Sequence, residues 1–160
     1  MALDMFLTLD GIAGESTDPV HKGAIEISSW SWGLSEPASM ASAGASAGAG
    51  KVAIQNIVIH KNVDIASPLL IQHCAQGAHI ASGSIFVRKG GDPKDFLVFK
   101  MTNVLVLSVT VDAAASSDLP TETVTLAFSK FEFDYSTLSA TGALGAQKSV
   151  GWDIVENKLT

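Results

Sequence analysis

Alternation of apolar and polar residues is the feature of this sequence that most limits its fold. The first run, LDMFLTL at residues 3–9, places four apolar side chains in one phase and ends at the turn pair Asp10-Gly11. Residues two apart lie on the same face of a strand, so each such run predicts a half-buried β-strand. The run at 95–112 is long enough for two strands or one bent strand, with a break expected at Thr102-Asn103. The other runs are residues 25–34, 51–60, 83–89, 121–135 and 147–156.

Two of these runs change phase partway along their length. Apolar residues move from odd to even positions within 25–34, and from even to odd positions within 121–135. A one-residue change of phase sends every later side chain to the opposite face of a sheet. We therefore expect β-bulges near Ser28-Ser29 and near Ser129-Lys130, which would bend both strands into a barrel.

One segment has the pattern of a helix instead. Residues 67–77, SPLLIQHCAQG, offer Ser67 as an N-cap, Pro68 at the first helical position and Gly77 just past the end. The middle of the segment is apolar on almost every side, so the helix should pack against a sheet or an open barrel end. The sequence thus predicts a mainly β fold, an antiparallel β-barrel or sandwich of seven to nine strands with one short α-helix.

A shortage of charge indicates how the outside of this fold is used. Charged residues make up 16% of the 160 residues and apolar residues 47%, whereas about 25% of an average domain is charged. The length fits a single domain, residues 1–160. No apolar run approaches the roughly 20 residues that cross a bilayer, so membrane insertion is not expected. The surplus apolar surface predicts contacts between copies of the chain.

Charge sign and cysteine content restrict the partners and the compartment. A net charge of −6 argues against nucleic acid, which binds to basic surfaces. Cys74 is the only cysteine, so an internal disulfide is impossible, in agreement with folding in a reducing cytoplasm. No Lys or Arg precedes Lys22, so the N-terminal segment lacks the basic region of a secretory signal.

The stretch SAGASAGAGK at residues 42–51 imitates two active-site motifs. Around Ser46 it fits the G-x-S-x-G spelling of a hydrolase nucleophile elbow, and its end resembles a phosphate-binding loop. Ala45 stands where the phosphate loop needs a glycine, and Val52 where it needs a magnesium-binding Ser or Thr. An elbow leads into a helix, whereas residues 52–59 are strand-like. We expect a long loop here, with no catalytic residue and no cofactor.

Other chemical groups are equally weak as sites. His60, His73, Cys74 and His79 lack the spacing of zinc ligands, so no metal is expected. Glu132 and Asp134 alternate with aromatic residues, which predicts a solvated strand face for both acids.

Trp30-Ser31-Trp32 is the most distinctive local feature. The two tryptophans could form a platform for sugars or peptides, but we favour the core, which large aromatic residues usually fill. In that case strand alternation places Ser31 on the opposite face of its strand.

Several motifs in order resemble the haemolysin-coregulated protein (Hcp) family of bacterial type VI secretion systems. They are MALDMFLTLDGIAGES, WSWGLS, the Gly/Ala loop ending AGAGK, VDIASPLLIQHCAQG, IFVRKGG, TETVTLAF and VGWDIVEN. The resemblance extends from Met1 to about Asn157. It implies a small β-barrel with one helix and no catalytic activity. It also implies six-membered rings that stack into the inner tube of a contractile injection machine and carry small effectors in the ring lumen.

The resemblance also suggests partners and roles for particular residues. The implied partners are further copies of the chain, type VI effectors, a tip spike protein and a contractile sheath. The protein would assemble in the cytoplasm and be secreted by the type VI system without a cleaved signal peptide. Ser31 would face the lumen and help to bind effectors. The residues expected to help rings stack are Ser39, Met40, Ser42, Gly44, Ser46, Gly48 and Gly50.

Two other classes of function remain as alternatives at this stage. A small serine hydrolase would use Ser46 as its nucleophile. A monomeric carbohydrate-binding β-domain would expose Trp30 or Trp32. Particle size in solution distinguishes them from a tube protein, because only the tube protein must form a large ring.

Overall fold

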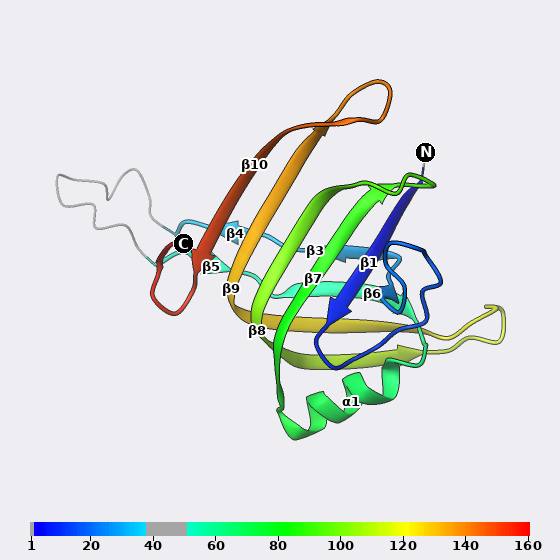
Figure 1. Cartoon of the computed structure of the whole chain (residues 1–160). Coiled ribbons are helices and arrows are strands. Elements are labelled where there is room, and N and C mark those ends of the chain that lie inside the picture. The colour runs from blue at the N-terminus through cyan, green and yellow to red at the C-terminus, as the bar shows by residue number, and fades with distance from the viewer. Residues whose placement is uncertain (1, 38–50) are drawn as a thin grey trace.

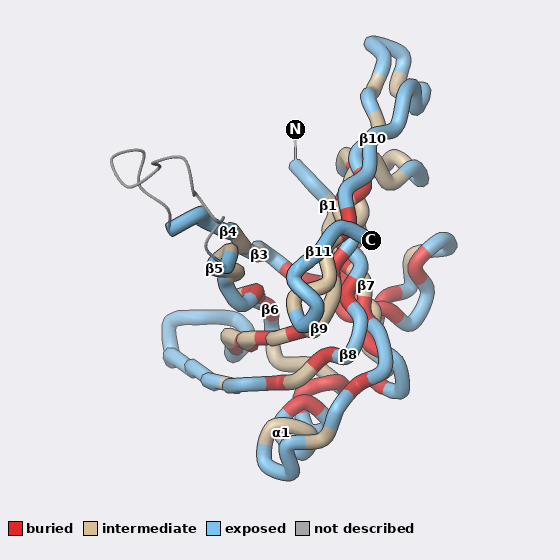
Figure 2. Tube along the Cα trace, turned by 90° about the vertical axis from the view of Figure 1, so that its left-hand side faces the viewer, coloured by how far each residue is buried: buried red, intermediate tan, exposed pale blue. Residues whose placement is uncertain are grey.

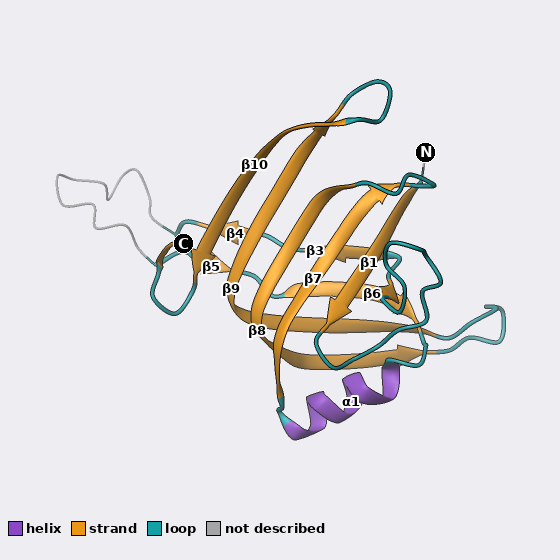
Figure 3. Cartoon of the chain, in the orientation of Figure 1, coloured by secondary structure: helices purple, strands orange, loops and turns teal. Residues whose placement is uncertain are grey.

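A computed structural model describes residues 2–37 and 51–160. These residues form one helix and eleven strands, coloured by type in Figure 3. In chain order the elements are β1 (Leu3–Leu9), β2 (Ile25–Glu26), β3 (Ser29–Ser31), β4 (Leu34–Ser35), β5 (Ala53–Ile54), β6 (Ile57–Asn62), α1 (Ser67–Gln76), β7 (His79–Lys89), β8 (Asp95–Asp112), β9 (Thr121–Leu138), β10 (Leu144–Asp153) and β11 (Lys158–Leu159).

Nine of the strands belong to one antiparallel sheet that folds over on itself (Figure 1). Its main path runs β11-β10-β9-β8-β7-β1-β2, while β6 pairs with β9 and β3 pairs with β6. One side of β9 pairs with β8. On the other side, the first half of β9 pairs with β6 and the second half pairs with β10. The strands β4 and β5 form a separate two-stranded sheet. The predicted mainly β, antiparallel fold with a single helix is confirmed.

The bend in β8 and β9 does not arise from the bulge expected at Ser129-Lys130. The ladder keeps one register across this point, pairing Thr102 with Lys130 and Val104 with Phe128. Between them Asn103 adopts a positive φ of 55°, which asparagine tolerates better than most residues. The register shift lies farther along, between Val106 and Ser108. Residues 95–112 are accordingly one bent strand, and the bend occurs where the sequence predicted a break.

Residues 25–34 are also not one bulged strand. β2 pairs with β1, β3 pairs with β6, and β4 pairs with β5, so this short segment moves between three partners. The phase change near Ser28-Ser29 marks the place where the chain leaves β1 for β6. The run 51–60 is likewise divided into β5 and β6.

The helix matches its predicted extent but not its predicted cap. Ala66 is the N-cap and makes no side-chain capping bond with any described residue, while Ser67 is already helical. At the other end Gly77 has the left-handed conformation (φ 62°), and its N–H donates to the Cys74 carbonyl. Leu70 is buried where α1 packs against β8 (Figure 1). No helix among the described residues is long and apolar enough to cross a membrane.

An aromatic cluster fills the centre of the core, and the buried residues gather where the two parts of the sheet face each other (Figure 2). The Trp32 ring lies 4.8 Å from the rings of Phe99 and Phe131, and the Trp30 ring lies 6.0 Å from Phe99. Both tryptophans therefore pack against the core, as predicted. Both tryptophans are only partly exposed, whereas the carbohydrate-binding alternative requires one of them on an exposed platform. Trp32 also lines the open groove described below.

One acidic residue is buried on a strand face that the sequence pattern predicted to be solvated. Asp134 was expected on a solvated face, but it is buried and its carboxylate lies 3.1 Å from Lys100 Nζ. Glu132 is exposed as expected. Strand alternation separates the two faces of a sheet, but it does not say whether another segment covers the second face.

Candidate functional site

The strands β3, β6, β9 and β8 form a layer with an inward and an outward face. Ser31 pairs with Val58, Val58 with Thr125, and Thr125 with Ser108. The next row consists of Ser29, His60, Thr123 and Thr110. The tryptophans on either side of Ser31 pack inward and Ser31 itself is exposed, so both rows lie on the outward face.

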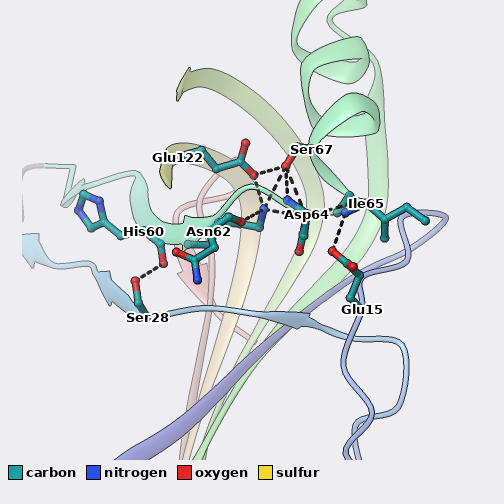
Figure 4. Close-up of polar contacts among 10 residues, drawn as sticks. Glu15, Ser28, His60, Asn62, Asp64, Ile65, Ser67 and Glu122 are labelled. Carbon is teal, nitrogen blue, oxygen red and sulfur yellow. Dashed lines mark hydrogen bonds and ion pairs between the residues drawn. The ribbon is translucent and has the colours of Figure 1, made fainter. Parts of the chain in front are cut away.

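We call these eight residues the hydroxyl face. Six of them are Ser or Thr, and none is Asp, Glu, Lys or Arg. The His60 ring is held by its Nδ1 atom, 3.0 Å from Thr123 Oγ1. The Ser28 hydroxyl donates to the His60 carbonyl at 2.9 Å (Figure 4). The hydroxyl face can thus donate and accept hydrogen bonds without fixed charge.

A buried ion pair lies on the inward side of the same layer. Lys61 and Glu122 face each other across β6 and β9, and each is only 1% exposed. Lys61 Nζ pairs with Glu122 and with Asp64 Oδ1, the latter at 2.8 Å. The Ser67 hydroxyl donates to Glu122 Oε1 at 2.8 Å (Figure 4). These contacts join both strands to the start of α1, and they give Lys61 Nζ and Glu122 Oε1 the partners that buried charges require. Glu122 Oε2 has no hydrogen-bond partner among the described residues.

This pair was missed although the sequence contains a signal for it. Lys61 continues the inward phase of Ile57 and Ile59, and Glu122 begins the inward phase of Val124 and Leu126. A lysine and a glutamate in the apolar phase of two strands predict a buried pair once the strands are known to be neighbours.

A second charged cluster fastens the β1–β2 connection to the sheet. The Asp18 carboxylate accepts hydrogen bonds from the Arg88 guanidinium, which is buried. These bonds hold the pKa of Asp18 at about 2, below its ordinary 3.8. The His21 ring lies between Phe6 and Phe86, at centroid distances of 4.8 and 4.5 Å, and its Nε2 is 2.9 Å from Asp95. The cluster consists of residues that position a loop.

An open apolar groove lies beside the β4–β5 hairpin and β10. It has a volume of about 570 Å³, within the range of about 300–1,000 Å³ typical of binding pockets. We call it the apolar groove; its lining residues are Trp32, Leu34, Glu36, Val52, Ile54, Phe131, Phe133, Val150 and Trp152.

The histidines and the cysteine considered as metal ligands are dispersed. His60 contacts Thr123, His73 Nδ1 lies 2.9 Å from the Leu69 carbonyl, and His79 Nδ1 lies 2.9 Å from Asn103. Cys74 packs against the core from α1. Within residues 2–37 and 51–160, no three His, Cys, Asp or Glu residues are grouped so as to hold a metal ion.

The residues assigned to ring stacking are not among those that the structure describes. Ser39, Met40, Ser42, Gly44, Ser46, Gly48 and Gly50 all lie within residues 38–50, outside the described residues. Among the predicted site residues, only Ser31 lies in the part of the chain that the structure describes. Its neighbours on the hydroxyl face are residues that the sequence did not single out.

Comparisons with known sequences agree over most of the chain. A family model described as "Type VI secretion system effector, Hcp" matches residues 6–135. Protein hcp1 of Pseudomonas aeruginosa is 36% identical, and the match covers 98% of each chain.

Solved structures agree with the sequence comparisons. A structure described as that of a type six secretion system protein has a TM-score of 0.93 and 30% identity, and the match covers 99% of this chain and 100% of that one. The crystal structure of Hcp1 from Salmonella typhimurium has a TM-score of 0.85 and 34% identity, with 100% of both chains covered. The chain therefore belongs to the Hcp family, whose members are secreted structural proteins of type VI secretion rather than enzymes.

Proposed function

We propose that this protein forms six-membered rings that stack into the inner tube of a type VI secretion system, with residues 1–160 acting as one tube domain. The observation that carries the proposal is membership of the Hcp family across 98% of the chain. The low charge content, 16%, supports it, because persistent interfaces between subunits are poor in charge.

The hydroxyl face is proposed to line the ring lumen and to contact small effectors. Ser31 stands in a row of short uncharged side chains, which leave space in a channel and offer hydrogen bonds to many kinds of cargo. A neutral lining also avoids holding charged cargo too tightly for release, because the eight residues contribute no fixed charge.

The remaining parts of the proposal concern assembly and export. Ser39, Met40, Ser42, Gly44, Ser46, Gly48 and Gly50 would help one ring to contact the next. The rings would assemble in the cytoplasm, meet the tip spike protein and the contractile sheath, and leave the cell without a cleaved signal peptide.

Native mass spectrometry of the purified protein tests the ring. We expect a hexamer at micromolar concentration and physiological salt, and a stable monomer would refute the proposal. Deletion of residues 41–48 tests stacking separately: single rings should persist while tube formation is impaired, and unchanged tube formation would contradict the role of the loop.

The Ser31→Glu variant tests the lumen assignment. It adds a negative charge per subunit and fills space, so capture of a type VI effector from cells should fall while the ring mass is unchanged. Ser82→Glu is the matched control, because Ser82 is exposed on β7, outside the hydroxyl face. Normal effector capture by Ser31→Glu would place cargo binding elsewhere, and loss of the ring would place Ser31 in a subunit interface.

A further inference from the structure

Two apolar surfaces lie at opposite ends of the molecule. The connection between β8 and β9 projects at the right of Figure 1, whereas the apolar groove lies beside β4, β5 and β10 at the left. Every residue from 110 to 121 is exposed, including Val111 at 51% and Leu119 at 56%. Because the two surfaces are at opposite ends, the hairpin cannot fill the groove of its own chain.

The two surfaces also differ in charge. Asp112 and Asp118 are exposed on the hairpin, and the chain has no Lys or Arg between Lys100 and Lys130. At the groove, exposed Lys51 directly precedes the lining residue Val52, and exposed Lys148 lies two positions before Val150 on β10. Glu36 also lines the groove, but the two lysines beside it outnumber this one carboxylate. An acidic hairpin with apolar side chains thus complements the apolar groove and its surroundings.

We propose that the β8–β9 hairpin of one copy docks in the apolar groove of the next copy, with Leu119 and Val111 entering the groove and Asp118 near its lysines. This inference rests on the proposed ring and says which surfaces form it. A contact between two different surfaces repeats head to tail and closes into a ring when the rotation per subunit allows. A contact between identical surfaces would stop at a dimer.

Aspartate substitutions test whether both surfaces are needed for assembly. Leu119→Asp and Val150→Asp should each abolish the hexamer seen by native mass spectrometry, because each places a charge in a desolvated contact. Ile71→Asp is the matched control: Ile71 is 47% exposed in the middle of α1, belongs neither to residues 110–121 nor to the groove lining, and this variant should keep the ring. Retention of the wild-type hexamer by either test variant would overturn the docking.

Crosslinking tests whether the two surfaces meet each other. In a Cys74→Ser background, the double variant Leu119→Cys/Val150→Cys is treated with a short flexible bis-maleimide. Head-to-tail docking predicts a ladder of covalent species up to the hexamer, whereas a mixture of the two single variants should give dimers only. Ile71→Cys/Val150→Cys is the control and should give no ladder, because Ile71 lies on α1 outside the hairpin and the groove.

The outcomes distinguish this inference from the ring itself. A wild-type monomer would refute both proposals. A hexameric double variant without a crosslinked ladder would refute the docking and leave the ring intact.

Discussion

Replacement of Lys61 by methionine should destabilise the protein far more than the loss of a lysine normally does. Methionine can fill the space of the lysine stem, so little packing is lost. The change instead removes the cation from Glu122, whose side chain is fully buried beside it. A buried carboxylate without its partner keeps the cost of leaving water and loses the compensating attraction.

The expected loss is about 3–5 kcal/mol, the cost of removing one partner of a buried pair. Total stabilities of single domains are about 5–15 kcal/mol, so the variant should lose a large fraction of its stability. Adding Glu122→Met should restore much of the loss, because an apolar pair of similar volume is often neutral or better. The remaining acid, Asp64, still accepts a hydrogen bond from the Ala66 N–H at 3.0 Å.

Urea denaturation of the single and double variants at one protein concentration measures this coupling. The concentration is kept fixed because assembly makes apparent stability depend on it. Lys158→Met is the matched control: Lys158 pairs with Glu156 on the surface, where such pairs contribute at most about 1 kcal/mol. A loss below about 1 kcal/mol for Lys61→Met, or a double variant no more stable than the single one, would refute the reasoning.

Three further predictions concern the loop anchor, the core and the helix end. The Arg88 guanidinium holds the pKa of Asp18 at about 2, so the stability from this pair is complete above about pH 4 and is lost as the pH falls toward 2; carboxyl titration by NMR checks this, and an ordinary pKa near 3.8 would contradict it. Phe99→Ala should cost about 3–5 kcal/mol in urea denaturation, because Phe99 is fully buried among aromatic rings, and a loss below about 1 kcal/mol would show a loosely packed centre. Gly77→Ala should cost about 1–2 kcal/mol, since φ there is 62° with open space around the position, and an unchanged unfolding midpoint would contradict a backbone cause.

Local pattern predicted the elements that depend on near neighbours along the chain. β1 runs from Leu3 to Leu9 as the alternation of LDMFLTL indicates. α1 ends before Gly77 as predicted, and it begins at Ser67, one residue before the predicted first helical position, Pro68. Ser31 is exposed because its neighbours Trp30 and Trp32 are packed inward. Each of these results follows from the side-chain periodicity of a strand or from the φ preference of one residue.

Strand partners, by contrast, were decided by the tertiary structure. The phase changes in 25–34 and 121–135 were visible in the sequence, but their cause was an exchange of neighbours and a bend at Asn103, not the expected bulges. A phase change indicates that the inward-facing side chains have switched to the other face of the strand. It does not indicate which strand lies next to that face.

The sequence by itself determined which side chains turn inward, including Lys61 and Glu122 in the apolar phase of their strands. Only the tertiary structure decided that these two charges meet, that Asp134 is covered, and that hairpin and groove lie at opposite ends. The physical reason is the separation along the chain over which each property is set. Alternation is fixed by the backbone geometry of a few consecutive residues, whereas burial and pairing depend on segments that are distant in the chain. Lys61 and Glu122 are separated by 61 positions, and the pairing of β6 with β9 brings them together.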